Sequence, residues 1–309
     1  MTIPHEGMDH ALYEFLPLPD RPALRWPGGA ALAGTVFLYL EHWELLPAEG
    51  TLRDPRFRDP FGDFRPDYRA YTWREYGNRI GIFRLLDVLD RTELKVTVAA
   101  NASACDRYPY LVDELLKRDY EFAAHGSHAT RMLTSRMPEA EERDFIASSV
   151  GRVSRASGKP CAGWIGQDYA ESERTPFLLA ELGLAYLADW PNDDLPYLMA
   201  DGKIVSLPNQ SELDDVQLMW HRRVLAPRYS EMIAEAATEL AAEAKRANAG
   251  RFMGLHLHPW LAGMPHRFPH VVRAIEAFAA TDGLWSATAA EVALAAAPQL
   301  RQPQAWRMP

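Results

Sequence analysis

Short apolar runs that end in ionisable side chains most constrain what this chain can fold into. Three such runs, TVFLYL, YEFAA and RFMGL, are followed by Glu41 and His42, by His125 and His128, and by His256 and His258. Each run is typical of a strand that is buried on both faces. The C-terminal ends of parallel strands meet on one face of a sheet, and ligands bind there. The sequence therefore predicts one active site that is assembled from three distant segments.

Strand-like and helix-like segments alternate along most of the chain. The candidate strands are 31–41, 94–100, 120–124, 160–165, 184–189, 203–207, 252–257 and 283–286. This alternation predicts an α/β protein with a parallel sheet and right-handed crossovers. The turn EHWELLP after the first strand lacks the glycines of a doubly wound nucleotide-binding fold. We therefore expect a closed or nearly closed barrel.

Composition and charge narrow the range of partners. No break in composition marks a domain boundary, so residues 1–309 are expected to form a single barrel domain with a Pro-rich N-terminal arm, 1–30. The net charge is −9, from 33 basic and 42 acidic residues, and no Lys/Arg stripe is present, which argues against nucleic acid as a partner. No apolar run is long enough to span a bilayer, so no membrane association is expected.

The N-terminus and the cysteines indicate a cytoplasmic protein. The first residues, MTIPHEGMDHALYEF, lack the basic and apolar regions of a signal peptide. Cys105 and Cys161 have no metal-binding spacing and suggest free thiols in a reducing compartment. We therefore expect a small cytoplasmic substrate.

Six motifs give the chain a resemblance to a known family. They are WPGGAALAGTVFLYLEHWE (26–44), YGNRIGIFRLLDVLD (76–90), EFAAHGSHAT (121–130), GWIGQDYAESERTPFLLAELG (163–183), DWPNDDLPY (189–197) and LHLHPWLAGMPHR (255–267). Together they resemble the polysaccharide deacetylase (NodB-homology) superfamily, and within it the branch of metal-independent allantoinase. The resemblance implies a distorted, TIM-like (β/α) barrel with about seven strands.

The same resemblance implies an enzyme that hydrolyses a non-peptide C–N bond in a small amide, ureide or imide. By its match to the family motifs, Glu41 is the expected base that activates water, and His258 is the expected acid that protonates the leaving nitrogen. His125 is expected to stabilise the developing oxyanion. Two other functions stay open: a metal-dependent N-deacetylase of an acetylated sugar or amine, and a non-catalytic barrel that binds a ligand.

The metal-binding motif of the family is altered in this chain. His42 stands where the family has a carboxylate ligand, and Ala129 stands four residues after His125, where the family has a second histidine. We therefore expect no metal cofactor. The alternative is a zinc site made of His42, His125 and His128, because a step of three along a helix leaves side chains on neighbouring faces.

Further residues are expected to bind the substrate. Trp164 stands in the motif where the family carries an arginine, and its ring is a candidate for stacking on a flat substrate. His256 is expected one layer below His258 on the same strand. The full set of expected substrate contacts is His42, His128, Trp164, Asn192, Asp193, Asp194 and His256.

Two segments predict assembly into a homo-oligomer, either a dimer or a tetramer. The arm holds the apolar residues Leu12, Tyr13, Phe15, Leu16 and Leu18. The long loop 44–73 carries the aromatic residues Phe57, Phe61, Phe64, Tyr68, Tyr71 and Trp73. We expect the arm and the loop to help close the active site, with a neighbouring subunit burying their apolar surface. In the alternative, both segments pack on their own barrel.

Overall fold

A computed structural model describes residues 10–49, 51 and 64–302. Nine strands in this part of the chain join one sheet in the order β6-β7-β5-β4-β3-β2-β1-β8, with β9 also paired to β1. They are β1 (Leu32–Leu40), β2 (Val96–Ala100), β3 (Glu121–Ala124), β4 (Gly163–Trp164), β5 (Tyr186–Leu187), β6 (Tyr197–Met199), β7 (Ile204–Ser206), β8 (Arg251–Leu257) and β9 (Leu284–Ser286). All pairs are parallel except the hairpin of β6 and β7.

The distorted α/β barrel expected from the sequence is confirmed. Each of the eight predicted strand segments overlaps an observed strand, and the sheet has nine strands where about seven were expected. The additional strand is β6, which runs against the direction of the others and comes directly before β7.

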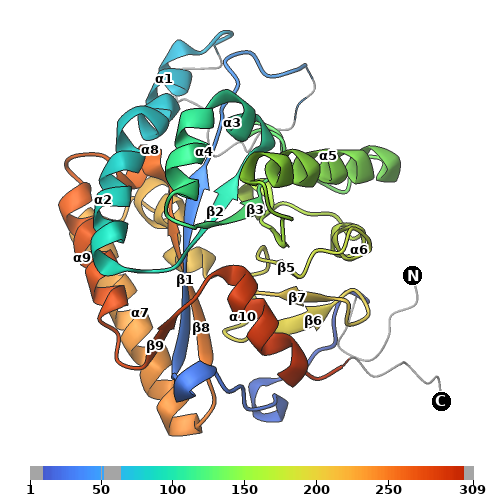
Figure 1. Ribbon diagram of the computed structural model, residues 1–309, viewed down its shortest axis with the longest axis vertical. Helices are drawn as coiled ribbons and strands as arrows, with labels where there is room; N and C mark the ends of the chain where they lie inside the picture. Colours follow the sequence, from blue (N-terminus) through green and yellow to red (C-terminus); the bar gives the residue numbers. More distant parts are fainter. Residues whose placement is uncertain (1–9, 50, 52–63, 303–309) are drawn as a thin grey trace.

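Helices cover the outer face of the sheet (Figure 1), with α2, α7 and α9 along one side and α5 on the other. The helices are α1 (Tyr68–Tyr76), α2 (Ile82–Thr92), α3 (Ala102–Arg107), α4 (Pro109–Leu116), α5 (Glu139–Ser157), α6 (Thr175–Glu181), α7 (Ala226–Ala247), α8 (Pro259–Ala262), α9 (Phe268–Ala279) and α10 (Ala289–Ala296). Two π-helical turns, Gly77–Gly81 and Val216–His221, follow α1 and precede α7 respectively. None of the described helices combines the length and apolar character needed to cross a bilayer.

Strand β1 is buried on both faces, and its side chains divide into two cores. Val36, Leu38 and Leu40 pack in the outer core, between the sheet and the helices. Phe37 and Tyr39 belong to the inner core, inside the barrel. Helix α10 contributes its own apolar face to the inner core and fills the end of the barrel at which the strands begin. The opposite end, where the strands finish, is therefore left for a site.

The sheet does not close by strand pairing between β6 and β8 in the described part of the chain. The free edge of β8 is bonded instead by a side chain and a loop. Gln210 donates from Nε2 to the carbonyl oxygen of Phe252 (3.2 Å), and its Oε1 accepts from the backbone N–H of Gly254 (2.8 Å). The N–H of Phe252 donates to the carbonyl oxygen of Asp194 (3.1 Å).

The described part of the arm packs on its own barrel. Tyr13 makes edge contacts with Trp190 and Tyr197, and Arg21 forms an ion pair with Asp193. These contacts lie at β6 and in the segment before it, so residues 10–30 pack on their own barrel, as in the alternative. Closure of an active site by the arm stays a prediction. In the long loop, Phe57 and Phe61 lie outside the described residues.

Candidate active site

Alternation along the strands brings the predicted catalytic side chains into one cleft. Leu40 of β1, Ala100 of β2 and Ala124 of β3 are aligned by the parallel register. These three side chains face the outer core, so the next residues of β1 and β3, Glu41 and His125, turn inward. The inner face of β8 contributes His258 by the same rule.

The cleft, together with the open solvent at its mouth, has a volume of about 360 Å³. It is lined by Tyr39, Glu41, Trp43, His125, Gln167, Asp168, Tyr169, Asp214, Val216, Gln217, His258 and Trp260. Its walls are therefore aromatic, and its hydrogen-bonding groups come from five separate segments. Such a mixture favours a small, flat and polar ligand.

N–H donors surround the carboxylate of Glu41. Trp260 Nε1 donates to Oε2 (3.2 Å), and Trp43 Nε1 makes a longer contact with the same oxygen (3.5 Å). Gln167 Nε2 donates to the other oxygen, Oε1 (3.2 Å). Glu41 itself is 5% exposed, so these donors replace the water that would otherwise solvate its charge.

The charges around Glu41 keep it ionised. Burial acts to raise its pKa, but the interaction with His125 and the positive charges of His258, His125 and Arg74 lower the pKa to about 2. The Nε2 atom of His125 lies 3.8 Å from Glu41 Oε1. Glu41 is therefore a carboxylate at neutral pH, although a base with so low a pKa depends on its surroundings to accept a proton.

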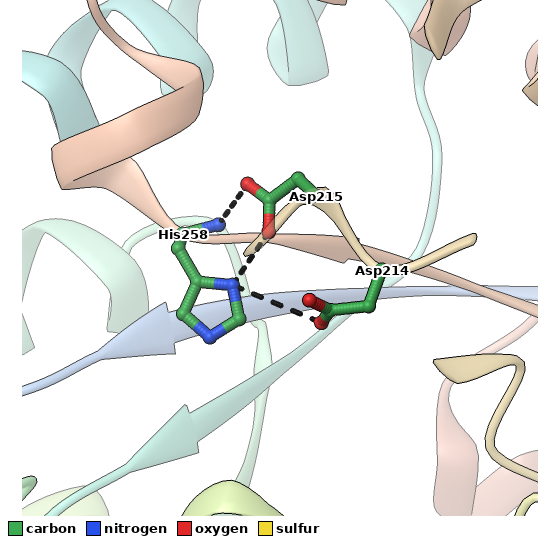
Figure 2. A group of neighbouring side chains, drawn as sticks. All are labelled: Asp214, Asp215 and His258. Atoms are coloured by element: carbon green, nitrogen blue, oxygen red, sulfur yellow. Dashed lines mark hydrogen bonds and ion pairs between the residues drawn. The ribbon is translucent and has the colours of Figure 1, made fainter. Parts of the chain in front are cut away.

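His258 is held by two consecutive carboxylates, Asp214 and Asp215 (Figure 2). Both oxygens of Asp215 accept from His258: Oδ1 from the ring Nδ1 (2.6 Å) and Oδ2 from the backbone N–H (2.8 Å). The nearest oxygen of Asp214 lies 3.9 Å from Nδ1. The second ring nitrogen, Nε2, points away from both carboxylates.

This arrangement makes His258 a strong candidate for a general acid. Burial acts to lower its pKa, but the negative charges of Asp215 and Asp214 and the hydrogen bond with Asp215 raise the pKa to about 9. The imidazolium form therefore prevails at neutral pH. The ring also stacks on Tyr39, with centroids 3.8 Å apart and an interplanar angle of 12°, which fixes its orientation.

His125 has its ring orientation fixed by the backbone. Its Nδ1 lies 2.7 Å from the carbonyl oxygen of Ile165, so Nδ1 carries the proton. Nε2 then faces Glu41 and donates a hydrogen bond only when the ring is positively charged. A role in stabilising an oxyanion through Nε2 thus requires a proton on that nitrogen.

Asp214, Asp215 and His258 form the one group in the described part of the chain whose potential metal-ligating atoms all lie within 4.8 Å of one another. However, Asp214 already accepts from the hydroxyl of Tyr169 (2.6 Å) and the N–H of Gln217 (2.9 Å). Both oxygens of Asp215 are taken by His258. These four hydrogen bonds satisfy both carboxylates from within the protein.

The alternative zinc site of His42, His125 and His128 is not assembled. His42 Nδ1 contacts the hydroxyl of Tyr108 (3.1 Å), and His128 Nδ1 contacts Ser127 Oγ (3.1 Å). The rings of His42 and His128 have centroids 6.0 Å apart, and only His125 of the three lines the cleft. The spacing of three residues between His125 and His128 does not direct both side chains to one metal, because His128 lies in a loop after β3 rather than on a helix. His42 and His128 do not line the cleft, and their contact with substrate stays a prediction.

Trp164 and His256 do not reach the cleft either. Trp164 is fully buried in the outer core, because it pairs with Ala124 and shares its outward orientation. His256 lies inside the barrel, where it stacks on Phe37 with centroids 4.8 Å apart. Its Nδ1 contacts the hydroxyl of Tyr39 (2.8 Å), so it supports the ring on which His258 stacks.

The expected contacts of Asn192, Asp193 and Asp194 with substrate are not supported by their positions. After Asp189 the chain turns back toward the end of the barrel at which the strands begin. There Asp194 accepts from Phe252, near the start of β8. Asp193 pairs with Arg21, and Asn192 accepts from the hydroxyl of Tyr197 (2.9 Å).

Several residues of the cleft were not selected from the sequence. They are Tyr39, Trp43, Gln167, Asp168, Tyr169, Asp214, Val216, Gln217 and Trp260, together with Asp215, which does not line the cleft but bonds to His258. The pair Asp214-Asp215 had a detectable signal, because it is a polar pair downstream of the predicted strand 203–207. It also stands at the start of the π-helical turn Val216–His221, where backbone N–H groups favour a carboxylate.

Comparisons with known proteins agree with the fold and with the sequence motifs. The family model described as polysaccharide deacetylase matches residues 75–187. A protein of Schizosaccharomyces pombe that carries the name polysaccharide deacetylase is 25% identical over 244 residues, which cover 72% of this chain and 74% of that protein.

Two crystal structures share the architecture. One is a protein from Pseudomonas aeruginosa PAO1, named for the polysaccharide deacetylases, with a TM-score of 0.78, 24% identity and coverage of 90% of this chain and 95% of the other. The second is PuuE allantoinase, with a TM-score of 0.79, 23% identity and coverage of 94% and 97%.

Proposed function

We propose that this chain, which belongs to the polysaccharide deacetylase superfamily, hydrolyses a C–N bond of a small amide, ureide or imide without a catalytic metal. One observation carries the proposal: a buried carboxylate and a buried imidazolium face the same small cleft in the protonation states of a base and an acid. The likeness to an allantoinase supports a ureide or a related cyclic amide as the substrate class.

The proposed reaction uses three side chains of the cleft. Glu41 takes a proton from a water molecule, whose oxygen attacks the carbonyl carbon and forms a C–O bond. His125 stabilises the oxyanion that develops. His258 then donates the proton on Nε2 to the nitrogen as the C–N bond breaks, giving a carboxylic acid and an amine or amide. Asp215 retains its hydrogen bond to Nδ1 throughout and holds the ring in the correct orientation.

The first test is turnover by protein treated with a chelator. The panel contains cyclic ureides, cyclic imides, linear ureides and N-acetylated sugars and amines, and the metal content is measured in the same samples. We expect hydrolysis of a ureide or imide that is unchanged by the chelator and by added zinc. Activity on an N-acetyl compound that appears only with metal would support the metal-dependent deacetylase instead. Binding of a panel compound without any turnover would support a ligand-binding barrel.

The pH dependence provides a second test. Glu41, with a pKa of about 2, is ionised and His258, with a pKa of about 9, is protonated throughout the neutral range. We therefore expect kcat/KM to be flat from about pH 5 to about pH 8 and to fall above about pH 9, as His258 loses its proton. The measurement is a profile of kcat/KM from about pH 5 to about pH 10.5. A fall centred near the ordinary histidine pKa of about 6.5 would contradict the assignment.

Oligomerisation and a cytoplasmic location remain proposals. Phe15 and Leu18 of the arm are 65% and 52% exposed, so the arm retains apolar surface for a second subunit even though Tyr13 packs on its own barrel.

A further inference from the structure

A buried cation lies behind the tryptophan wall of the cleft. Arg74 of α1 is 6% exposed, and its guanidinium carbon lies 3.4 Å from the ring centroid of Trp260 and 4.4 Å from that of Trp43. Charged side chains are seldom buried to this extent without a compensating interaction. Arg74 does not line the main cleft; it lines a smaller cavity that shares Glu41, Trp43 and Trp260 with it.

Three tryptophans lie against Arg74, and two of them, Trp43 and Trp260, also present their N–H groups to Glu41. Trp260 Nε1 lies 3.2 Å from Glu41 Oε2, and Trp43 Nε1 lies 3.5 Å from it. Each indole therefore has a cation against its face and a carboxylate at its edge. A cation over an aromatic face is attracted by the ring and fixes its position, and polarisation along such a chain strengthens the hydrogen bond at the far end.

We propose that Arg74 is a positioning residue for Glu41: it fixes Trp260 and Trp43 so that their N–H groups hold the Glu41 carboxylate ionised and aimed into the cleft. The consequence for catalysis rests on the proposed function, whereas the effect on Glu41 itself does not. Arg74 acts through the tryptophans and through its own charge, and it does not contact the substrate.

The charged groups that face Glu41 come from three elements. His125 follows β3 and His258 follows β8, while Arg74 stands on α1. Asp168 and Asp214 line the same cleft and oppose these positive charges. Removal of Arg74 therefore leaves two histidines to stabilise the carboxylate, and protonation of Glu41 should become easier without being complete at neutral pH.

The experiment measures the ionisation of Glu41 directly. Difference infrared spectra between neutral and acidic pH show the carbonyl band of a protonated carboxyl, and its loss in Glu41→Gln assigns the band. In the wild type we expect the band near pH 2. In Arg74→Gln and in Trp260→Phe we expect the band to appear at a pH about one unit higher or more. In Arg74→Lys, which keeps the positive charge, the band should appear at a pH closer to that of the wild type.

Turnover gives an independent readout on the panel compound that the wild type hydrolyses fastest. We expect kcat to fall about 10- to 100-fold in Arg74→Gln and in Trp260→Phe, with partial recovery in Arg74→Lys. KM should change little in Arg74→Gln, because Arg74 does not line the cleft. Matched controls are Arg79→Gln, at a side chain that is 74% exposed on the next turn, and Trp220→Phe, in the same aromatic cluster but away from Glu41. Both controls should behave as the wild type.

An unchanged Glu41 band and an unchanged kcat in a folded Arg74→Gln protein would overturn the proposal. If that variant does not fold, the infrared band of Glu41 and kcat are measured in Trp260→Phe and Arg74→Lys, and these two measurements test the proposal. If no panel compound is hydrolysed by the wild type, the infrared band still decides, so failure of this inference is distinguishable from failure of the proposed function. Equal effects in Trp220→Phe would show a general packing role and would also overturn it.

Discussion

Glu41→Gln is expected to lower kcat/KM by about 10²- to 10⁴-fold, the range for loss of a positioned acid or base. Glutamine has almost the same shape, and its amide oxygen can still accept from Trp260 Nε1, which lies 3.2 Å from Oε2 in the wild type. The amide cannot take a proton from water at neutral pH. The loss should fall mainly on kcat, because the shape of the cleft is preserved. Steady-state kinetics on the preferred panel compound is the measurement.

Glu44→Gln provides the matched control for this substitution. Glu44 stands only three residues further along the chain, but its carboxylate is bonded to Thr130 and Arg131 and it does not line the cleft. Its replacement should leave kcat/KM close to that of the wild type. Retention of more than about a tenth of the activity in Glu41→Gln would remove Glu41 from the role of base.

Asp215→Asn is expected to lower kcat/KM at neutral pH by a similar factor, about 10²- to 10⁴-fold. The negative charge of Asp215 is the first of the interactions that raise the pKa of His258. Without this charge, the pKa of His258 falls and a smaller fraction of the enzyme carries the acid proton at neutral pH. The asparagine amide can also donate to Nδ1, which would hold the ring in the wrong tautomer.

The pH profile separates these effects from simple misfolding. In Asp215→Asn the alkaline fall in kcat/KM should move to lower pH, because burial still disfavours the charged ring. Asp193→Asn is the control, since Asp193 pairs with Arg21 away from the cleft. If Asp215→Asn has the kcat/KM of the wild type, and its kcat/KM falls at the same alkaline pH, then Asp215 does not set the pKa of His258.

The parts of the site that sequence reasoning located are those governed by strand alternation. Glu41, His125 and His258 each follow a recognisable apolar run, and register places such residues at one end of the barrel. The orientation of Trp164 could not be predicted in this way. Strand β4 has only two residues, so no alternation can be read from it, and the pairing of Trp164 with Ala124 decides which core receives the ring.

Other features depend on contacts between segments that lie far apart in the sequence. The approach of Trp260 to Glu41 joins the start of α8 to the end of β1, across 219 positions of the chain. Asp193 follows Asp189 closely, yet the chain reverses between them and carries Asp193 to the arm. The hydrophobic pattern records which residues are buried, but it does not record the direction that a short connecting segment takes.

Gln210 has a consequence for how this protein can associate with other molecules. The backbone of an outermost strand offers unpaired N–H and C=O groups, which can recruit a strand from another chain. On β8, the primary amide of Gln210 bonds to the carbonyl of Phe252 and the N–H of Gly254, just as a peptide group of an adjacent strand would. One side chain thus imitates a missing strand at this margin, so the backbone groups of Phe252 and Gly254 are not available to a strand of another chain.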